Sequence, residues 1–190
     1  MTPKRPHAHT PPRKFFLLTA FGKDRPGIVA GVSRVLFELG GNIEDASMTR
    51  LGGEFTMMLV TALPASAASL ETKLKTLAKK TGLQIAAKRI SSSIARRRKE
   101  EPPKYLVSVY GADHPGIVAR IAQALAKRKV SITDLQTKVT GSAQKPVYVM
   151  LIEFQAPDSL DMDGLRSELD QLRQDLKVEI SLQDIEAVAL

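Results

Sequence analysis

Cysteine and tryptophan are absent from this 190-residue chain, and histidine occurs only three times. Without cysteine the chain can form neither disulfide bonds nor thiolate metal sites, and an intracellular protein is the default expectation. No apolar run approaches the ~18 residues of a membrane-spanning helix, and residues 1–14 lack the apolar core of a signal peptide. These absences predict a soluble, cytoplasmic protein without a membrane contact.

Catalytic signatures are equally scarce. His114 is the only histidine after residue 9, and neither Gly-x-Ser-x-Gly nor Gly-x-x-x-x-Gly-Lys-Ser/Thr occurs. His7 and His9 lie in a proline-rich stretch without periodicity, where two imidazoles on a flexible arm make a poor metal site. We therefore expect a protein that is not an enzyme and that holds neither a metal nor a cofactor.

Positive charge is concentrated in two segments. The formal net charge of the chain is +8, whereas residues 1–14 and 88–104 together sum to +9, which leaves −1 for the remaining residues. A basic arm and a basic linker keep a protein soluble. Polybasic segments also bind phosphate backbones without sequence preference, so contact with nucleic acid stays open as a second interpretation.

The chain is an internal duplication. Gly22-Lys-Asp-Arg-Pro-Gly-Ile-Val-Ala30 returns 89 positions later as Gly111-Ala-Asp-His-Pro-Gly-Ile-Val-Ala119. A repeat on this scale indicates two domains of about ninety residues each. The sequence predicts four segments: a disordered basic arm over 1–13, a first domain over 14–90, a basic linker over 91–103 and a second domain over 104–190.

Both halves show the same order of hydrophobic patterns. Runs of β-branched and aromatic residues predict strands, and apolar residues at helical spacing predict amphipathic helices. The order β-α-β-β-α-β is typical of an α+β, ferredoxin-like fold, an antiparallel sheet with both helices on one face. The expected strands cover 15–21, 42–50, 55–63, 83–87, 105–110, 132–140, 147–155 and 178–182, the helices 26–39, 69–81, 115–129 and 161–176, and residues 183–190 have no assignment.

The repeated turn before the first helix of each half is the candidate binding element. Pro26 suits the first turn of a helix, and Asp24 and Asp113 stand where a carboxylate can cap exposed amides, so capping explains them without acid–base catalysis. Gly27 and Gly116 permit a ligand to approach the backbone closely. Free N–H groups at a helix start favour an anion, so a small carboxylate fits the turn.

At these positions the chain resembles a known family. The first half resembles an ACT domain, a small-molecule regulatory module, through Asp24-Arg-Pro-Gly-Ile28, Gly40-Gly-Asn-Ile43 and Gly52-Gly-Glu-Phe55. Asp113-His-Pro-Gly-Ile117 with Val130-Ser-Ile132 is similar to a second ACT domain. Tandem ACT domains without a catalytic domain resemble the glycine cleavage system transcriptional repressor family. That resemblance implies a repressor that contacts a transcriptional activator in response to glycine.

The resemblance also implies where a ligand binds. ACT domains pair through sheets or helices, which implies a homo-oligomer, and they hold amino acids at the pairing interface near the first turn and the start of the second strand. The implied ligand-binding residues are Asp24, Arg25, Gly27, Ile28 and Asn42 in the first half and Asp113, His114, Gly116 and Ile117 in the second. Ser131 replaces the amide of Asn42, so the halves are expected to differ. Asp45 and Asp134 are either exposed strand residues or acceptors for a ligand ammonium group.

Two alternatives to an amino-acid-responsive regulator stay open. One is a nucleic-acid-binding protein that uses the basic arm and linker. Ferredoxin-like RNA-binding modules stack bases on sheet aromatics, and Phe55-Thr-Met-Met-Leu-Val60 does not reproduce their motif. No helix-turn-helix signal is present either, so we expect no direct contact with nucleic acid. The other alternative is a dimerisation scaffold whose domains no longer bind a ligand.

Overall fold

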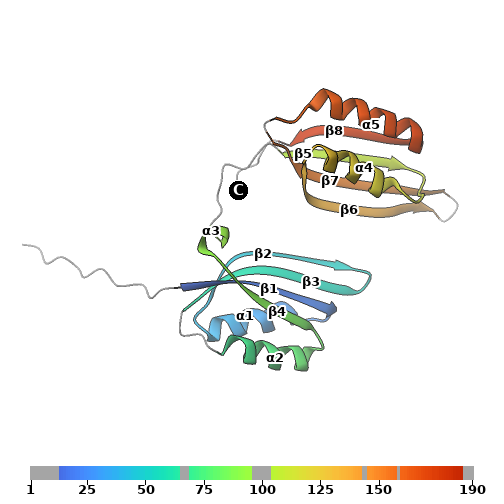
Figure 1. The fold of residues 1–190 in the computed structure, drawn as a ribbon. Helices are drawn as coiled ribbons and strands as arrows, with labels where there is room; N and C mark the ends of the chain where they lie inside the picture. Colours follow the sequence, from blue (N-terminus) through green and yellow to red (C-terminus); the bar gives the residue numbers. More distant parts are fainter. Residues whose placement is uncertain (1–12, 65–68, 96–103, 143–144, 158, 186–190) are drawn as a thin grey trace, which may run out of the picture. The chain divides into compact units, whose positions relative to one another are not determined.

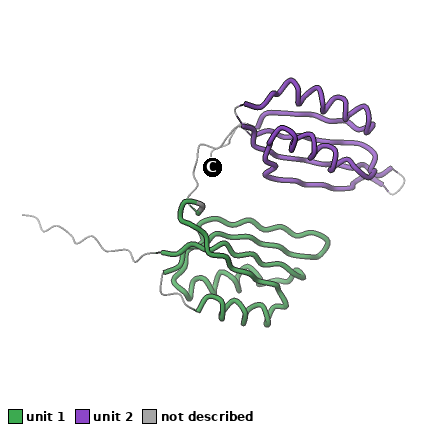
Figure 2. Tube along the Cα trace, viewed as in Figure 1, with its two compact units in different colours: residues 1–97 green, residues 98–190 purple. Residues whose placement is uncertain are grey.

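The structure is a computed structural model that describes residues 13–64, 69–95, 104–142, 145–157 and 159–185. The chain divides into two compact units, residues 1–97 and 98–190 (Figure 2). The division falls inside the predicted linker, and each unit contains one copy of the repeat. The predicted disordered arm, except Arg13, and residues 96–103 of the linker lie outside the described residues.

The first domain has the predicted β-α-β-β-α-β order (Figure 1). Its four strands form one sheet in the order β2-β3-β1-β4, in which every pair is antiparallel. The two long helices lie on one face of this sheet. The elements are β1 (Arg13–Lys23), α1 (Ile28–Glu38), β2 (Asn42–Leu51), β3 (Glu54–Pro64), α2 (Leu70–Thr81), β4 (Gln84–Ile90) and the short α3 (Ser92–Ala95).

Every second side chain of the central strands points to the helix-covered face and builds the core of this domain. Leu18 of β1 pairs with Leu59 of β3, and both side chains lie on the face that the helices cover. The helix α1 buries Val32 and Leu36 against that face, as its apolar spacing predicts. The helix ends at Glu38, and Gly40, which follows with a left-handed φ of 68°, donates its N–H to the carbonyl oxygen of Phe37.

The second domain repeats the arrangement. Its sheet has the order β6-β7-β5-β8, again with antiparallel pairs, and α4 and α5 lie on one face (Figure 1). Every leucine of the predicted stripe on the last helix, from Leu165 to Leu176, is buried in the core. The elements are β5 (Lys104–Gly111), α4 (Ile117–Lys127), β6 (Ser131–Ser142), β7 (Lys145–Gln155), α5 (Met162–Leu176) and β8 (Val178–Ile185). The ferredoxin-like fold is therefore confirmed in both halves.

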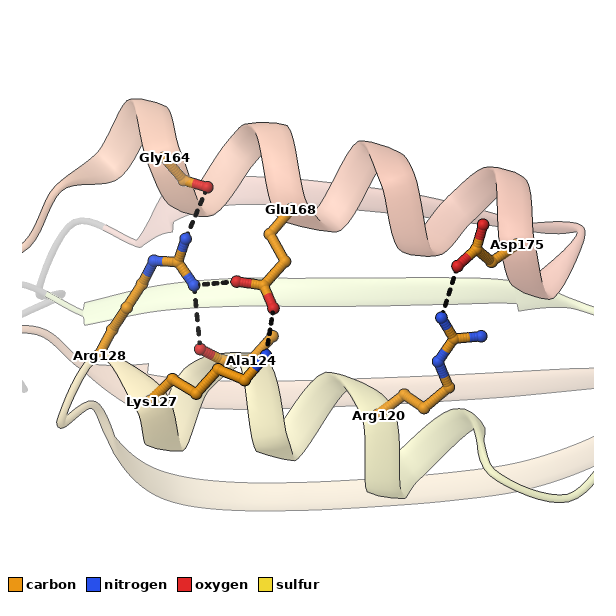
Figure 3. Close-up of polar contacts among 7 residues, drawn as sticks. All are labelled: Arg120, Ala124, Lys127, Arg128, Gly164, Glu168 and Asp175. Carbon is orange, nitrogen blue, oxygen red and sulfur yellow. Dashed lines mark hydrogen bonds and ion pairs between the residues drawn. The ribbon is translucent and has the colours of Figure 1, made fainter.

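Charged side chains join the two helices of the second domain (Figure 3). Glu168 of α5 accepts hydrogen bonds from Lys127 and Arg128, and Arg128 also donates to the carbonyl oxygen of Gly164 at 2.8 Å. At the other end of the helices, Arg120 donates to Asp175 at 2.6 Å. These contacts hold α4 beside α5 on the solvent side, while the buried leucines of α5 pack into the core (Figure 3).

Several predicted boundaries are wrong by a few residues. Arg13, assigned to the arm, is the first residue of β1 and pairs with Pro64. Ser92–Ala95, assigned to the linker, forms the short helix α3. The last strand continues through Ile185, so only residues 186–190 of the unassigned end lie outside the described residues. Pairing with a neighbouring strand extends β1 and β8 beyond what local propensity alone reveals.

The outer strands β2 and β6 are exposed along their whole length. Both contain a register shift at the same point of the repeat, between Ile43 and Asp45 and between Ile132 and Asp134. Such a bulge bends an edge strand and is typical of strands that have a pairing partner on one side only. Among the described residues, no helix has the length and apolar character needed to cross a membrane.

Candidate functional site

The turn between β1 and α1 exposes its backbone. Gly27 adopts a left-handed conformation with φ of 91°, and α1 begins at Ile28. No atom outside the chain neighbours lies within 4 Å of the position that a Cβ of Gly27 would occupy. The backbone beside the helix start is therefore open to a ligand, as the glycine predicts.

The predicted capping by Asp24 is wrong. The N-cap position of α1 is Gly27, and no side chain makes a capping hydrogen bond there. Asp24 instead accepts a hydrogen bond from Arg50 at 3.0 Å, and its own N–H donates to the carbonyl oxygen of Gly53 at 3.0 Å. The helix also begins two residues later than predicted, so Pro26 precedes it. A left-handed Gly27 separates Asp24 from the helix amides, which places the carboxylate across the turn.

Arg50 is a residue that the sequence analysis missed. It lies near the end of β2, opposite Phe55 of β3, on the same side of the sheet as α1. Its side chain is 67% exposed and that of Asp24 is 29% exposed. Their spacing of 26 residues in the sequence gives no local signal of contact. Only the hairpin from β2 to β3 brings the guanidinium to the turn.

A groove connects these residues. It has a volume of about 530 Å³, which lies within the ~300–1,000 Å³ of small-molecule sites. One wall is the turn and the first residues of α1, and the other wall comes from β2 and β3. The lining residues are Asp24, Arg25, Gly27, Ile28, Val29, Ala30, Met48, Arg50 and Phe55. Four of the five first-half residues that the resemblance implied are therefore brought together.

Asn42 is the residue that does not join them. It pairs with Ala62, which pairs with Phe15 at the start of β1, whereas the turn follows Lys23 at the other end. Eight residues of strand at about 3.3 Å each separate the two places by about 26 Å. Its side-chain amide donates to Glu44 at 3.1 Å. A single first domain thus cannot present Asn42 and Gly27 to one small ligand.

Asp45 is also distant from the turn. It lines a separate hollow of about 120 Å³ with Leu17 and Met58. Its exposed position on β2 agrees with the interpretation of Asp45 as an exposed strand residue. In the second domain the equivalent Asp134 accepts a hydrogen bond from Gln136 at 3.0 Å, and Ser131 pairs with Gln155 at the far end of the sheet from Gly111.

The second turn has the same backbone and a different set of side chains. Gly116 has φ of 100°, again with no atom within 4 Å of its Cβ position, and α4 begins at Ile117 without a side-chain cap. Capping by Asp113 is therefore also wrong. His114 Nε2 lies 2.8 Å from the carbonyl oxygen of Leu176, so this ring nitrogen must carry the proton and donate. The histidine is thereby tied to the end of α5.

Two substitutions change the wall of the second turn. Val139 lies opposite Tyr148, as Arg50 lies opposite Phe55, so a valine replaces the guanidinium. Tyr148 replaces Phe55, and burial, followed by the charge of Asp113, raises the pKa of its hydroxyl, while a hydrogen bond with Thr137 acts in the opposite direction. The second turn consequently has a carboxylate without the arginine partner of the first.

Metal binding has no support from the described part of the chain, in which no group of three or more histidine or acidic side chains could hold an ion. Each turn has one carboxylate; the first also has two guanidiniums, and the second also has an imidazole and the hydroxyl of Tyr148. These groups can bind charged small molecules. They do not form the paired base and nucleophile that acyl transfer needs.

Comparison with known proteins identifies the modules. The model of the ACT domain matches residues 14–88 and again residues 104–183. The chain belongs to the ACT domain family. Among curated relatives of this ACT-domain protein is the glycine cleavage system transcriptional repressor of Escherichia coli (strain K12), with 28% identity over 171 residues and 88% of each chain covered.

Solved structures agree with this relationship. A crystal structure of an unknown protein from Galdieria sulphuraria has a TM-score of 0.79 and 26% identity, covering 92% of this chain and 100% of the other. A second structure, provisionally named a glycine cleavage system transcriptional repressor, has a TM-score of 0.67 and 26% identity, covering 92% and 98%. This chain is therefore an ACT-domain regulatory protein that is related to that repressor.

Proposed function

We propose that this ACT-domain protein senses an amino acid and passes its bound state to a protein partner that controls transcription. The observation that supports the proposal is the groove at Gly27, where open backbone, one carboxylate and two guanidiniums meet. Its relationship to the glycine cleavage repressor makes glycine or a similar amino acid the first candidate ligand and a transcriptional activator the first candidate partner. The proposal includes a cytoplasmic location and a role without catalysis.

The binding chemistry follows from the turn. A carboxylate at the start of α1 meets backbone N–H groups that have no partner within the helix. Each charge-assisted hydrogen bond contributes about 1.5–3 kcal/mol, and the helix dipole adds about 0.3–1 kcal/mol. Two or three such contacts give a micromolar to millimolar affinity once the entropic cost of binding is subtracted. That range suits a sensor of a free metabolite.

Signal transfer requires two states that bind the amino acid differently. The exposed edge strands β2 and β6 are surfaces by which this chain would pair with a second copy. Pairing is also the way to bring an Asn42 beside a Gly27, because one domain holds them at opposite ends of its sheet. A bound amino acid at such a junction would favour the paired state.

Isothermal titration of the full chain with each of the twenty common amino acids tests the sensing role. We expect saturable heat with glycine or a small relative, and heat-silent titrations with all twenty would refute it. A pull-down of transcriptional activators by the tagged full chain, with and without the bound amino acid, tests the partner. A shift of duplex DNA by the chain alone would instead favour the nucleic-acid interpretation.

A further inference from the structure

The geometry points to one amino-acid site per chain, in the first domain, in which the Asp24–Arg50 ion pair is exchanged for the two charged ends of a zwitterionic amino acid. The ammonium group of the ligand would bind the carboxylate of Asp24, and its carboxylate would bind the guanidinium of Arg50. This inference rests on the proposed sensing function and adds the recognition chemistry and the number of sites.

The position and the charges of the ion pair suit such an exchange. Asp24 and Arg50 approach to 3.0 Å on facing walls of the groove, beside the open backbone of Gly27. An α-amino acid also has one positive and one negative group a short distance apart, so each protein charge finds a partner of opposite sign. Exposed ion pairs contribute little to stability, so opening this one costs little. The ligand then replaces one hydrogen-bonded ion pair by two.

The second domain lacks the cationic residue of this ion pair. Val139 stands in place of Arg50, and this residue is 53% exposed. His114 stands in place of Arg25, and its Nε2 proton is donated to Leu176. The helix start and the glycine are the same in both turns, so the backbone alone does not distinguish them. The carboxylate of Asp113 would repel the carboxylate of a ligand that has no guanidinium to bind.

The exchange requires both charges on one molecule. Acetate would bind Arg50 and leave Asp24 without its partner, and methylamine would bind Asp24 and leave Arg50 without one. We therefore expect both half-molecules to bind at least tenfold more weakly than the amino acid. A site that used only the amides of the helix start would accept acetate as readily as glycine, since those amides bind the carboxylate alone.

The test is isothermal titration of the full chain and three variants with the twenty amino acids, acetate and methylamine. Arg50→Val gives the first groove the residue of the second, and we expect a loss of affinity of roughly tenfold to hundredfold, as removal of a charged hydrogen-bond partner implies. Asp24→Asn should reduce the preference for glycine over acetate. Lys75→Ala, which removes an exposed cation on α2, is the matched control and should bind as the unchanged chain does.

The outcomes separate the two levels of the proposal. If no amino acid gives heat, the sensing function itself fails and this inference with it. If an amino acid binds with two equivalents per chain, or if Arg50→Val leaves its affinity unchanged while circular dichroism shows a folded variant, this inference is wrong and sensing stands. One equivalent per chain, lost in Arg50→Val and kept in Lys75→Ala, supports it.

Discussion

Gly27 and Gly116 have φ angles of 91° and 100°, in the left-handed region that residues with a Cβ avoid. Crowding does not explain why glycine occupies these two positions, since nothing lies within 4 Å of either Cβ position. The left-handed backbone conformation explains it. A left-handed residue turns the chain sharply from the strand into the helix, and it keeps the preceding aspartate away from the helix amides. The same residue therefore shapes the fold and exposes the candidate site.

Substitutions of Gly27 test whether backbone strain, rather than steric crowding, requires glycine at this position. Gly27→Ala should lower the free energy of unfolding by about 1–2 kcal/mol, because the left-handed conformation is costly for a residue with a Cβ. Gly27→Asn should lose less, since asparagine tolerates this region better. Urea unfolding followed by circular dichroism measures both. An alanine variant as stable as the unchanged chain would mean that the turn does not hold the left-handed conformation.

At the scale of elements, the helix pairs of the two domains are joined differently. In the second domain, hydrogen bonds from Arg128, and then from Lys127, hold the pKa of the Glu168 carboxyl below its usual value, although partial burial acts in the opposite direction (Figure 3). Among the described residues of the first domain, the corresponding contact is a hydrogen bond from Lys73 to Glu38 at 2.6 Å. The second helix pair thus depends more on ionised carboxylates, which ties its stability to pH.

Glu168→Gln tests that dependence. At pH 7 the variant should lose roughly 0.5–1 kcal/mol of stability, the size expected of a partly exposed ion pair. The folded-state pKa of Glu168 is lowered, so its contribution is present above the unfolded pKa and is lost as pH falls through the folded value. The two proteins should therefore converge in thermal unfolding at a pH below the lowered folded-state pKa of Glu168, which lies under the ~4.3 of a free glutamate.

Glu71→Gln is the control for this experiment. Glu71 is 81% exposed and lies 4.0 Å from Lys75, so its removal should leave the unfolding temperature unchanged at both pH values. A Glu168→Gln deficit that persists at low pH would contradict the electrostatic origin and point to altered packing between α4 and α5.

At the scale of the whole molecule, the described residues form two separate hydrophobic cores. One contains Leu36 and Leu59 of the first domain, and the other contains Ile121 and Ile152 of the second, with no residue in common. Each core lies between its own sheet and its own helices. Two cores of this kind are expected to unfold as two cooperative units, because a lost contact in one leaves the other intact.

Cavity-forming substitutions measure that independence. Ile121→Ala should destabilise the second domain by about 2–5 kcal/mol, the usual cost of an alanine at a fully buried position. Native-state hydrogen exchange should show the loss in the second domain alone, and Leu36→Ala should give the reverse pattern. Equal loss of protection in both domains from either variant would show that the units unfold together.

The sequence predicted the elements well because their signals are local. The stripe from Leu165 to Leu176 identifies a helix with one buried face, and the repeat around Gly27 and Gly116 identifies two copies of one fold. Hydrophobic periodicity is read over neighbouring residues, so it predicts a helix or strand without its partners. The errors lie at boundaries such as Arg13 and α3, where strand pairing and packing extend or begin an element.

By itself the sequence determined the duplication, because a motif is repeated. It also determined the β-α-β-β-α-β order and the glycine that opens each turn, since these depend on spacing within a few residues. Tertiary structure alone decided what surrounds the turns. Asp24 meets Arg50 across 26 positions and His114 meets Leu176 across 62 positions, because strand register and helix packing place them together. The same register moves Asn42 to the other end of its sheet. Contacts between distant segments arise from the fold as a whole, so no local pattern contains them.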